Sequence, residues 1–351
     1  MKIDKKQANI IAHLIEKWNE NGLISADQAK QLKESYVEDI TDNGFDWQNL
    51  AFIAFFFAAT CVILAVVLML ADEWLMELMD TILGAHDGLK AVFFAILGAG
   101  LYYLAVWKRK QYPEKVYSNE ALFLFGAIGV AFSWMYIGYA LDTGSGYFPM
   151  VILLTAISYC ILGVYLDSKL TWLLGLLALA VWFGTETSYR SGWEPYFWGM
   201  NYPLRFVIFG IGLIGASQVF KKQHRLNDFA VLTYFTGLLG LFFALWLLSI
   251  FGNHGDWDVW YETAQSGMIL WDILFGVAAG VAIWYGLRYH DTKTKDIGIA
   301  FLLLNLYTRY FEYFWDNLHK VVFFSILALS FWLIGRKAEQ IWNLSGQKKD
   351  T

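Results

Sequence analysis

Four polar residues share one stripe of a hydrophobic segment near the C-terminal end of the 351-residue chain. Asn305, Arg309, Glu312 and Asp316 are spaced so that they lie on one face of a helix. A membrane-spanning helix rarely holds an arginine and a glutamate, and those it holds usually pair with each other and face protein or water. The stripe therefore predicts a site for an ion, a proton or a small polar solute. The alternative is a static ion-pair network that fixes helix register.

Three more charged residues are expected on the same outer side of the membrane. Asp272 lies near the start of one apolar segment, Glu186 at the end of another, and Arg205 at the start of a third. At about 1.5 Å of rise per residue, Arg309 lies roughly 20 Å from the inner end of its helix and about 10 Å from the outer end. We therefore expect one charged cluster that opens outward and includes Arg309 and Glu312.

Other motifs that support chemistry are scarce in this chain. Loop 189–203, YRSGWEPYFWGMNYP, is rich in Trp and Tyr, which suit either stacking on a sugar or lipid headgroup or an interfacial aromatic belt. The histidines show no metal-ligand spacing, and Cys61 and Cys160 lie in apolar segments. The sequence has no phosphate-binding glycine loop, nucleophile elbow or CxxC motif. It therefore predicts no metal, no cofactor and no catalytic residue.

The elements that must position these residues are apolar helices. The composition is 58% hydrophobic and 16% charged, against roughly 45–50% and 25% in soluble domains. Most of the apolar segments are about 18–23 residues long, which suffices to cross a bilayer. The ten predicted spans are 49–71, 89–107, 121–141, 148–166, 170–187, 203–220, 229–251, 268–288, 296–315 and 319–335.

The distribution of charge predicts the orientation of these spans. Most lysines and arginines lie in the leader and in alternate loops, whereas the intervening loops are acidic. Cytoplasmic loops carry the excess of Lys and Arg. The predicted fold is therefore all-α: a polytopic transmembrane helix bundle of about ten spans, with both termini cytoplasmic and with the lipid bilayer as its surroundings.

Three domains follow from this layout: a helical hairpin over 1–47, a transmembrane domain over 48–337 and a basic tail over 338–351. In the hairpin, a capping box beginning at Ser25 starts the second helix. The hairpin is too short for a large core, so we expect it to pack on the membrane domain or on a cytoplasmic protein partner. Its second half is acidic, which argues against nucleic acid as a partner.

Two likenesses within the chain suggest an internal repeat. The octapeptide that begins at Lys90 resembles the one at Lys320, and a looser copy begins at Arg205. The pentapeptide at Tyr165 resembles the one at Tyr289. These pairs predict a duplicated four-helix unit over 121–220 and 229–335, in parallel orientation. The alternative is that aromatic-rich helices with basic ends match by chance.

The leader also resembles a known family. Glu16-Lys-Trp18, then Gly22-Leu-Ile-Ser25-Ala-Asp-Gln-Ala29 and Leu32, followed by apolar spans, is similar to the bacterial membrane proteins catalogued as domain of unknown function 2157. The stretch Arg309-Tyr-Phe-Glu312-Tyr-Phe looks like a late-helix motif of such proteins. The resemblance implies a bacterial cytoplasmic (inner) membrane location, and it implies no function.

Three functional hypotheses remain. The first is transport or permeation of a small solute or ion, bound by Arg309, Glu312, Asp272, Glu186, Asn305 and Arg205. The second is a non-transporting membrane sensor or assembly scaffold that uses the N-terminal hairpin. The third is a membrane enzyme acting on a lipid or sugar headgroup, although no nucleophile and base can be recognised.

Overall fold

The structure is a computed structural model. It describes residues 2–3, 14–15, 17–19, 23–34, 37–38, 86–113, 115–141, 148–262 and 265–342. The predicted span 49–71 and most of the predicted tail lie outside these ranges. The chain divides into two compact units, Met1–Met76 and Glu77–Thr351. The domain boundary predicted after residue 47 stays a prediction.

The first unit contains the predicted capping box. Helix α2, Ala26–Glu34, follows Ser25. The Ser25 backbone N–H donates to Gln28 Oε1 over 2.9 Å, and the Gln28 N–H donates to Ser25 Oγ over 3.3 Å. Sequence reasoning did not predict the short parallel pair of β1, Lys2–Ile3, with β2, Val37–Glu38.

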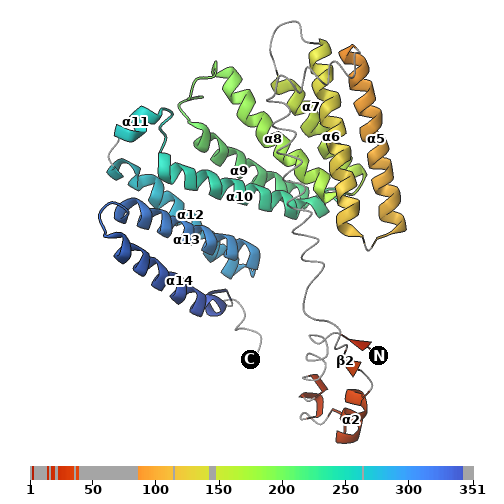
Figure 1. Cartoon of the computed structure of the whole chain (residues 1–351), viewed down its shortest axis with the longest axis vertical. Helices are drawn as coiled ribbons and strands as arrows, with labels where there is room; N and C mark the ends of the chain where they lie inside the picture. The colour runs from red at the N-terminus through yellow and green to blue at the C-terminus, as the bar shows by residue number, and fades with distance from the viewer. Residues whose placement is uncertain are drawn as a thin grey trace. The chain divides into compact units, whose positions relative to one another are not determined.

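The second unit consists of helices, which succeed one another in space much as they do in the chain (Figure 1). The long helices coincide with the predicted apolar segments, and some of the helices extend several residues beyond the predicted ends. They are α5 Asp87–Gln111, α6 Val116–Leu141, α7 Pro149–Tyr165, α8 Lys169–Arg190, α9 Tyr202–Phe220, α10 Asn227–Phe251, α12 Ile269–Arg288, α13 Thr292–Phe314 and α14 Lys320–Trp342. Two short elements, α11 Trp257–Glu262 and the 3₁₀ helix η1 Gln265–Met268, precede α12.

Six of the described helices are long and apolar enough to cross a membrane: α5, α6, α8, α9, α10 and α12. Helix α7 is apolar but shorter. Helix α13, which carries Arg309 and Glu312, is not among the six. Large apolar side chains such as Ile96 and Leu270 lie exposed on the outer faces of these helices. The chain is therefore a helical membrane protein whose apolar helices contact the lipid bilayer.

Neighbouring helices pack in pairs: α5 with α6, α7 with α8, α9 with α10, and α12 with α13. Glycines permit the closest approaches. A Cβ added at Gly129 of α6 would lie 2.7 Å from Gly98 Cα of α5, and one at Gly237 of α10 would lie 3.0 Å from the Gly210 oxygen of α9. Gly98 and Gly237 thus serve close helix packing, whereas Gly100 has open space around it.

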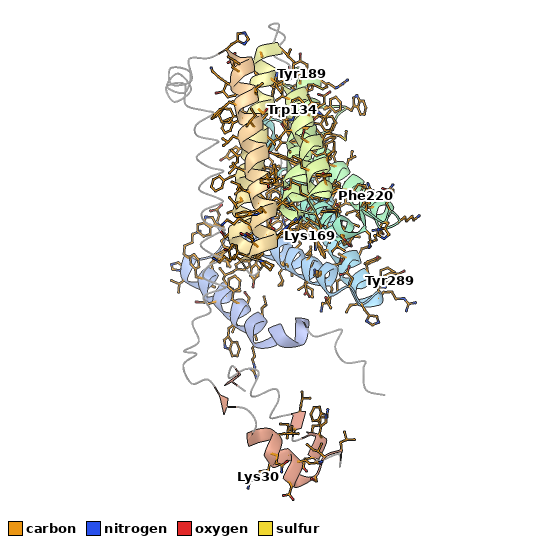
Figure 2. The ribbon with its side chains drawn as sticks, turned by 90° about the vertical axis from the view of Figure 1, so that its right-hand side faces the viewer. Lys30, Trp134, Lys169, Tyr189, Phe220 and Tyr289 are labelled. Carbon is orange, nitrogen blue, oxygen red and sulfur yellow. The ribbon has the colours of Figure 1, made fainter. Side chains whose placement is uncertain are left out.

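The two ends of the second unit are chemically different. Arg109, at the end of α5, donates to the carbonyl oxygens of Leu166 and Asp167 in the α7–α8 turn. The α5–α6 turn and the α7–α8 turn therefore lie at the same end of the unit. Figure 2 shows Lys169, Phe220 and Tyr289 toward that end and Tyr189 at the other. We call the first the basic end. At the opposite end, Asn201 donates to the carbonyl oxygens of Gly252 and His254. We call this the acidic end, because Asp256, Asp258 and Glu262 follow in the sequence.

Candidate functional site

Arg309 of α13 connects three helices near the acidic end. Its Nη1 donates to Asp272 Oδ2 of α12 over 3.0 Å and forms an ion pair with Glu312 one turn further along α13. Its Nη2 donates to the backbone oxygen of Ser249 of α10 over 2.9 Å. The side chains of Arg309, Asp272 and Glu312 are 15%, 12% and 22% exposed, so water screens these charges poorly.

Asn305 extends this cluster one helical turn deeper. Its Nδ2 donates to the backbone oxygen of Asp272 over 3.2 Å. Gly276 lies opposite: a Cβ there would be 3.4 Å from Asn305 Nδ2, which is ordinary contact. Asp272 lies in the first turn of α12, where the helix dipole favours a carboxylate. The structure therefore brings together four of the six predicted residues, Asp272, Asn305, Arg309 and Glu312.

Three polar atoms of this cluster lack a hydrogen-bond partner among the described residues. They are Asp272 Oδ1, Asn305 Oδ1 and Arg309 Nε, and all three are buried. Buried polar atoms are nearly always hydrogen-bonded, because an unpaired one costs roughly 1–3 kcal/mol. Two acceptors and one donor therefore remain available to a bound water, ion or polar solute.

Glu186 and Arg205 make their observed contacts elsewhere. Glu186 Oε1 accepts from Nε of Arg190 on the same helix over 2.5 Å. Arg205 is fully buried and donates to the backbone oxygens of Met200 and Pro195 over 3.0 and 2.9 Å. Its guanidinium also lies 4.6 Å from the ring centroid of Tyr202. Arg205 thus holds the turn before α9, because that turn folds back over the start of the helix.

A pocket of about 560 Å³ adjoins the cluster at Glu312. It is lined by Ile250, Trp260, Tyr261, Met268, Thr308, Phe311, Glu312, Trp315 and Asp316. Glu312 belongs both to this pocket and to the buried ion pair. The predicted stripe contains Glu312 and Asp316, but sequence reasoning did not connect them with Trp260 and Tyr261. The only available signal was the acidic, aromatic stretch from Asp256 to Glu262.

The Tyr189–Pro203 loop forms a tight structure at the acidic end. Phe197 and Met200 exchange backbone hydrogen bonds of 3.0 Å, and Trp198 between them is 86% exposed. Asn253 fastens the loop by donating from Nδ2 to the Gly199 oxygen over 2.8 Å. An exposed indole beside such a rigid turn fits the interfacial aromatic belt better than a closed sugar site.

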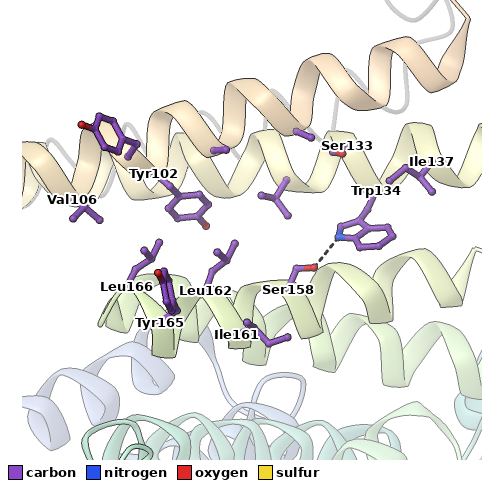
Figure 3. A pocket seen from close by; sticks show the side chains of 14 residues that line it. Tyr102, Val106, Ser133, Trp134, Ile137, Ser158, Ile161, Leu162, Tyr165 and Leu166 are labelled. Carbon is purple, nitrogen blue, oxygen red and sulfur yellow. Dashed lines mark hydrogen bonds between the residues drawn. The ribbon is translucent and has the colours of Figure 1, made fainter.

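A larger and mostly apolar pocket of about 650 Å³ lies among α5, α6 and α7 (Figure 3). Tyr102 and Leu162 contribute to its walls, and Trp134 Nε1 donates to Ser158 Oγ over 2.8 Å within it. Ser133, also in the wall, donates to the Ala91 oxygen over 2.9 Å. Ser133, Trp134 and Ser158 are thus paired, and the hydroxyl groups of three lining tyrosines, Tyr102, Tyr103 and Tyr165, are the other polar side-chain atoms of the wall. The remaining wall is apolar, so the pocket suits hydrocarbon better than an ion.

In the described residues, no three His, Cys, Asp or Glu side chains come together in a way that would hold a metal ion. Comparisons of the chain with protein-family models, with curated proteins and with solved structures found no match. The resemblance to domain of unknown function 2157 therefore stays a prediction, and the functional argument depends on the site itself.

Proposed function

We propose that this chain crosses the bacterial inner membrane about ten times, with both termini cytoplasmic, and admits a small cation from the acidic end. The asymmetry between the basic and acidic ends supports the orientation, because Lys and Arg concentrate on the cytoplasmic side of membrane proteins. The matching helices for the last nine predicted spans support the number of crossings.

The observation that carries the proposal is the set of unpaired buried atoms beside Arg309. Asp272 Oδ1 and Asn305 Oδ1 are oxygen acceptors without partners among the described residues. Oxygen ligands of this kind suit hard cations. A purely structural ion pair would be expected to satisfy these atoms, since an unpaired polar atom destabilises a buried network.

The pocket at Glu312 supports a cation over an anion. Its wall combines two carboxylates, Glu312 and Asp316, with the ring of Trp260, whereas the ring of Trp315 already has the Lys320 ammonium 3.8 Å from its centroid. Carboxylates attract cations, and an aromatic face adds roughly 0.5–2 kcal/mol of cation–π attraction. Further acidic residues at the same end would raise the local cation concentration. We infer a path from the acidic end, through this pocket, to Asp272 and Asn305.

Cysteine labelling tests this path. In a Cys61→Ala, Cys160→Ala background, we would introduce Thr308→Cys in the pocket, Asn305→Cys in the buried cluster, and Ala279→Cys in the core as the control. Sealed vesicles of each orientation would receive a trimethylammonium or a sulfonate methanethiosulfonate reagent. We expect the cationic reagent to modify Thr308→Cys from the acidic end about tenfold faster than the anionic one.

Labelling of Asn305→Cys from both faces would indicate alternating access and hence transport. Labelling from the acidic end alone would indicate a fixed vestibule and would contradict permeation. If folded protein reacts at neither position, the cluster is a dry structural pair and the proposal is wrong. Ala279 is fully buried, so the control must stay unmodified for the labels to be interpreted.

One observation favours the sensor or scaffold as a second candidate. In the first unit, Leu14, Trp18 and Leu32 are each 40–42% exposed, while Ile15 is buried. Exposed apolar side chains on a small helical unit are typical of a surface that binds a partner. A crosslinker placed at Trp18 in cells tests this candidate, and capture of lipid alone would argue against it.

A further inference from the structure

Two lysines flank one tyrosine ring at the basic end of the α5–α6 pair. Lys108 Nζ lies 5.3 Å from the ring centroid of Tyr112, and Lys115 Nζ lies 5.1 Å from the same centroid. The backbone oxygen of Tyr112 accepts from Asn119 Nδ2 over 3.0 Å, which holds the turn against the start of α6. The two ammonium groups thus lie beside a single ring and at most 10.4 Å from each other.

Neither lysine has a carboxylate partner among the ion pairs of the described residues. Arg109, between them in the sequence, is already engaged by the backbone of the α7–α8 turn and lies over the ring of Phe123. The two ammonium groups repel each other, and an anion placed between them would relieve that repulsion. Lys108 and Lys115 therefore form a positive site that the described residues do not neutralise.

The same lysines form the rim of a pocket of about 410 Å³. Its lining is Lys108, Tyr112, Lys115, Ser118, Asn119, Ala121, Leu122 and Phe125. Lys108 lies in the last turn of α5, the other polar members lie in the α5–α6 turn and the first turn of α6, and the apolar members follow along α6. Phe125 lies roughly 10 Å further along the helix axis than Ser118. The carboxylate of Glu120 does not line the pocket, and its Oε2 is buried.

We propose that this pocket binds one phospholipid with an anionic headgroup. The phosphate would lie between the ammonium groups of Lys108 and Lys115, with the Ser118 hydroxyl as a further donor. An acyl chain would follow Leu122 and Phe125 into the membrane. A zwitterionic lipid fits less well, because its own cation would face two lysines. Basic pockets between helices at a membrane surface recognise headgroups in this way.

The apolar wall distinguishes a lipid from a free anion. Phe125 is 45% exposed and continues the same pocket as the lysines. Free phosphate would contact only the rim, whereas a lipid would cover both the rim and the wall. This inference does not depend on the proposed permeation, because it concerns the opposite end of the molecule.

Native mass spectrometry of the full chain tests the proposal, with phosphatidylglycerol and phosphatidylcholine as probes. We expect phosphatidylglycerol to stay bound under activation that removes phosphatidylcholine. The double variant Lys108→Gln, Lys115→Gln should bind phosphatidylglycerol roughly thirtyfold more weakly, given about 1 kcal/mol per lysine. The matched control is Lys221→Gln, Lys222→Gln, which removes two lysines from the same end outside the pocket and should bind as the original chain does.

Three results would overturn the proposal. One is equal retention of the two lipids, and another is equal weakening by the double variant and its control. The third is competition by inorganic phosphate at the same concentration as the lipid, which would indicate a plain anion site. The variant Lys108→Arg, Lys115→Arg keeps both charges and should retain binding, so loss of binding there would also count against a charge-based site.

Discussion

In both the α7–α8 and the α12–α13 pairs, a glycine of the first helix lies against the backbone of the second. A Cβ added at Gly163 would lie 2.9 Å from the Trp172 nitrogen, and one at Gly286 would lie 2.6 Å from the Lys295 nitrogen. No side chain fits at these distances, so each glycine sets how closely its two helices approach.

The turns of the two pairs are also closed alike. Ser168 caps α8 by accepting from the Thr171 N–H, and Asp291 caps α13 by accepting from the Thr294 N–H, both over 3.2 Å. The residue before each cap has a positive φ, 49° at Asp167 and 55° at His290. This likeness supports the repeat as a proposal. It also matches Ser168 with Asp291, one residue away from the pairing that the sequence suggested.

The two pairs differ in where their charged residues find partners. In α8, Glu186 pairs with Arg190 on the same helix, and Arg190 is 66% exposed. In α13, Arg309 contacts Asp272 of α12 and Ser249 of α10. The two helix pairs thus have similar backbones, but α8 carries an ion pair within one helix, whose arginine is exposed, and α13 carries a mostly buried connection between helices. Function is therefore sought in the second pair, where the charged residues connect three helices.

The largest loss of stability should come from substituting Arg309, and Arg190 is the matched arginine for comparison. Arg309→Gln leaves Asp272 and Glu312 as buried carboxylates without their cation, and breaking a buried pair costs about 3–5 kcal/mol. Arg190 is 66% exposed although Glu186 is only 11% exposed, so water can replace part of the contact, and Arg190→Gln should cost less, about 1–3 kcal/mol. Unfolding in mixed detergent micelles, followed by circular dichroism, measures both free energies.

The double variant Arg309→Gln, Asp272→Asn serves as the control for charge. It removes a carboxylate together with the arginine, so it should recover part of the stability lost in Arg309→Gln. Equal costs for Arg309→Gln and Arg190→Gln would contradict the difference between the two helix pairs.

Glycine substitutions test what the two pairs share. Gly163→Ala and Gly286→Ala should each destabilise the protein by about 1–3 kcal/mol, because the added methyl group meets backbone atoms that cannot move aside. Gly280→Ala, in the same helix as Gly286, meets nothing within 4 Å, so it should be neutral or gain about 0.5–1 kcal/mol. Thermal unfolding in detergent distinguishes them, and a neutral Gly286→Ala would refute the close approach.

The sequence was sufficient to place the helices of the second unit, because apolar length and the polar turns between segments are local properties. It also indicated the stripe of Asn305, Arg309 and Glu312, since helical spacing alone puts these residues on one face. It did not indicate that Arg205 would bind the carbonyl oxygens of Met200 and Pro195. That contact depends on a loop folding back over its own helix, and no local pattern encodes this path.

A smaller effect is expected from the two helix caps. Ser168→Ala and Asp291→Ala should each cost about 1 kcal/mol by leaving the first turn of α8 or α13 without its acceptor. Asp291→Ala should cost more by about 0.3–1 kcal/mol, because a carboxylate also interacts with the helix dipole. Asp291→Asn, which keeps an acceptor and removes the charge, should cost only about 0.3–1 kcal/mol. Equal values for Asp291→Asn and Asp291→Ala would show that the charge alone stabilises this turn.

The smallest effects should come from two hydrogen bonds between helices, and their difference is informative. Trp134 donates to Ser158 over 2.8 Å beside the apolar pocket, and Trp246 donates to Thr308 over 2.9 Å beside the acidic one. Such bonds contribute about 0.6 kcal/mol on average in a membrane protein. If the acidic pocket holds water, water replaces the lost acceptor in Thr308→Val, and the cost should approach zero.

If hydrocarbon fills the apolar pocket, Ser158→Ala offers no such replacement, because lipid tails cannot accept a hydrogen bond from Trp134. It should therefore cost about 0.6 kcal/mol, the average contribution of such a bond in a membrane protein. Unfolding titrations of both variants, each with its tryptophan replaced by phenylalanine as a reference, isolate the hydrogen bond from the change in packing. Equal costs would mean that both pockets are dry. Since a cation cannot reach Glu312 through a dry pocket, that result would weigh against permeation through α13 even if the labelling were positive.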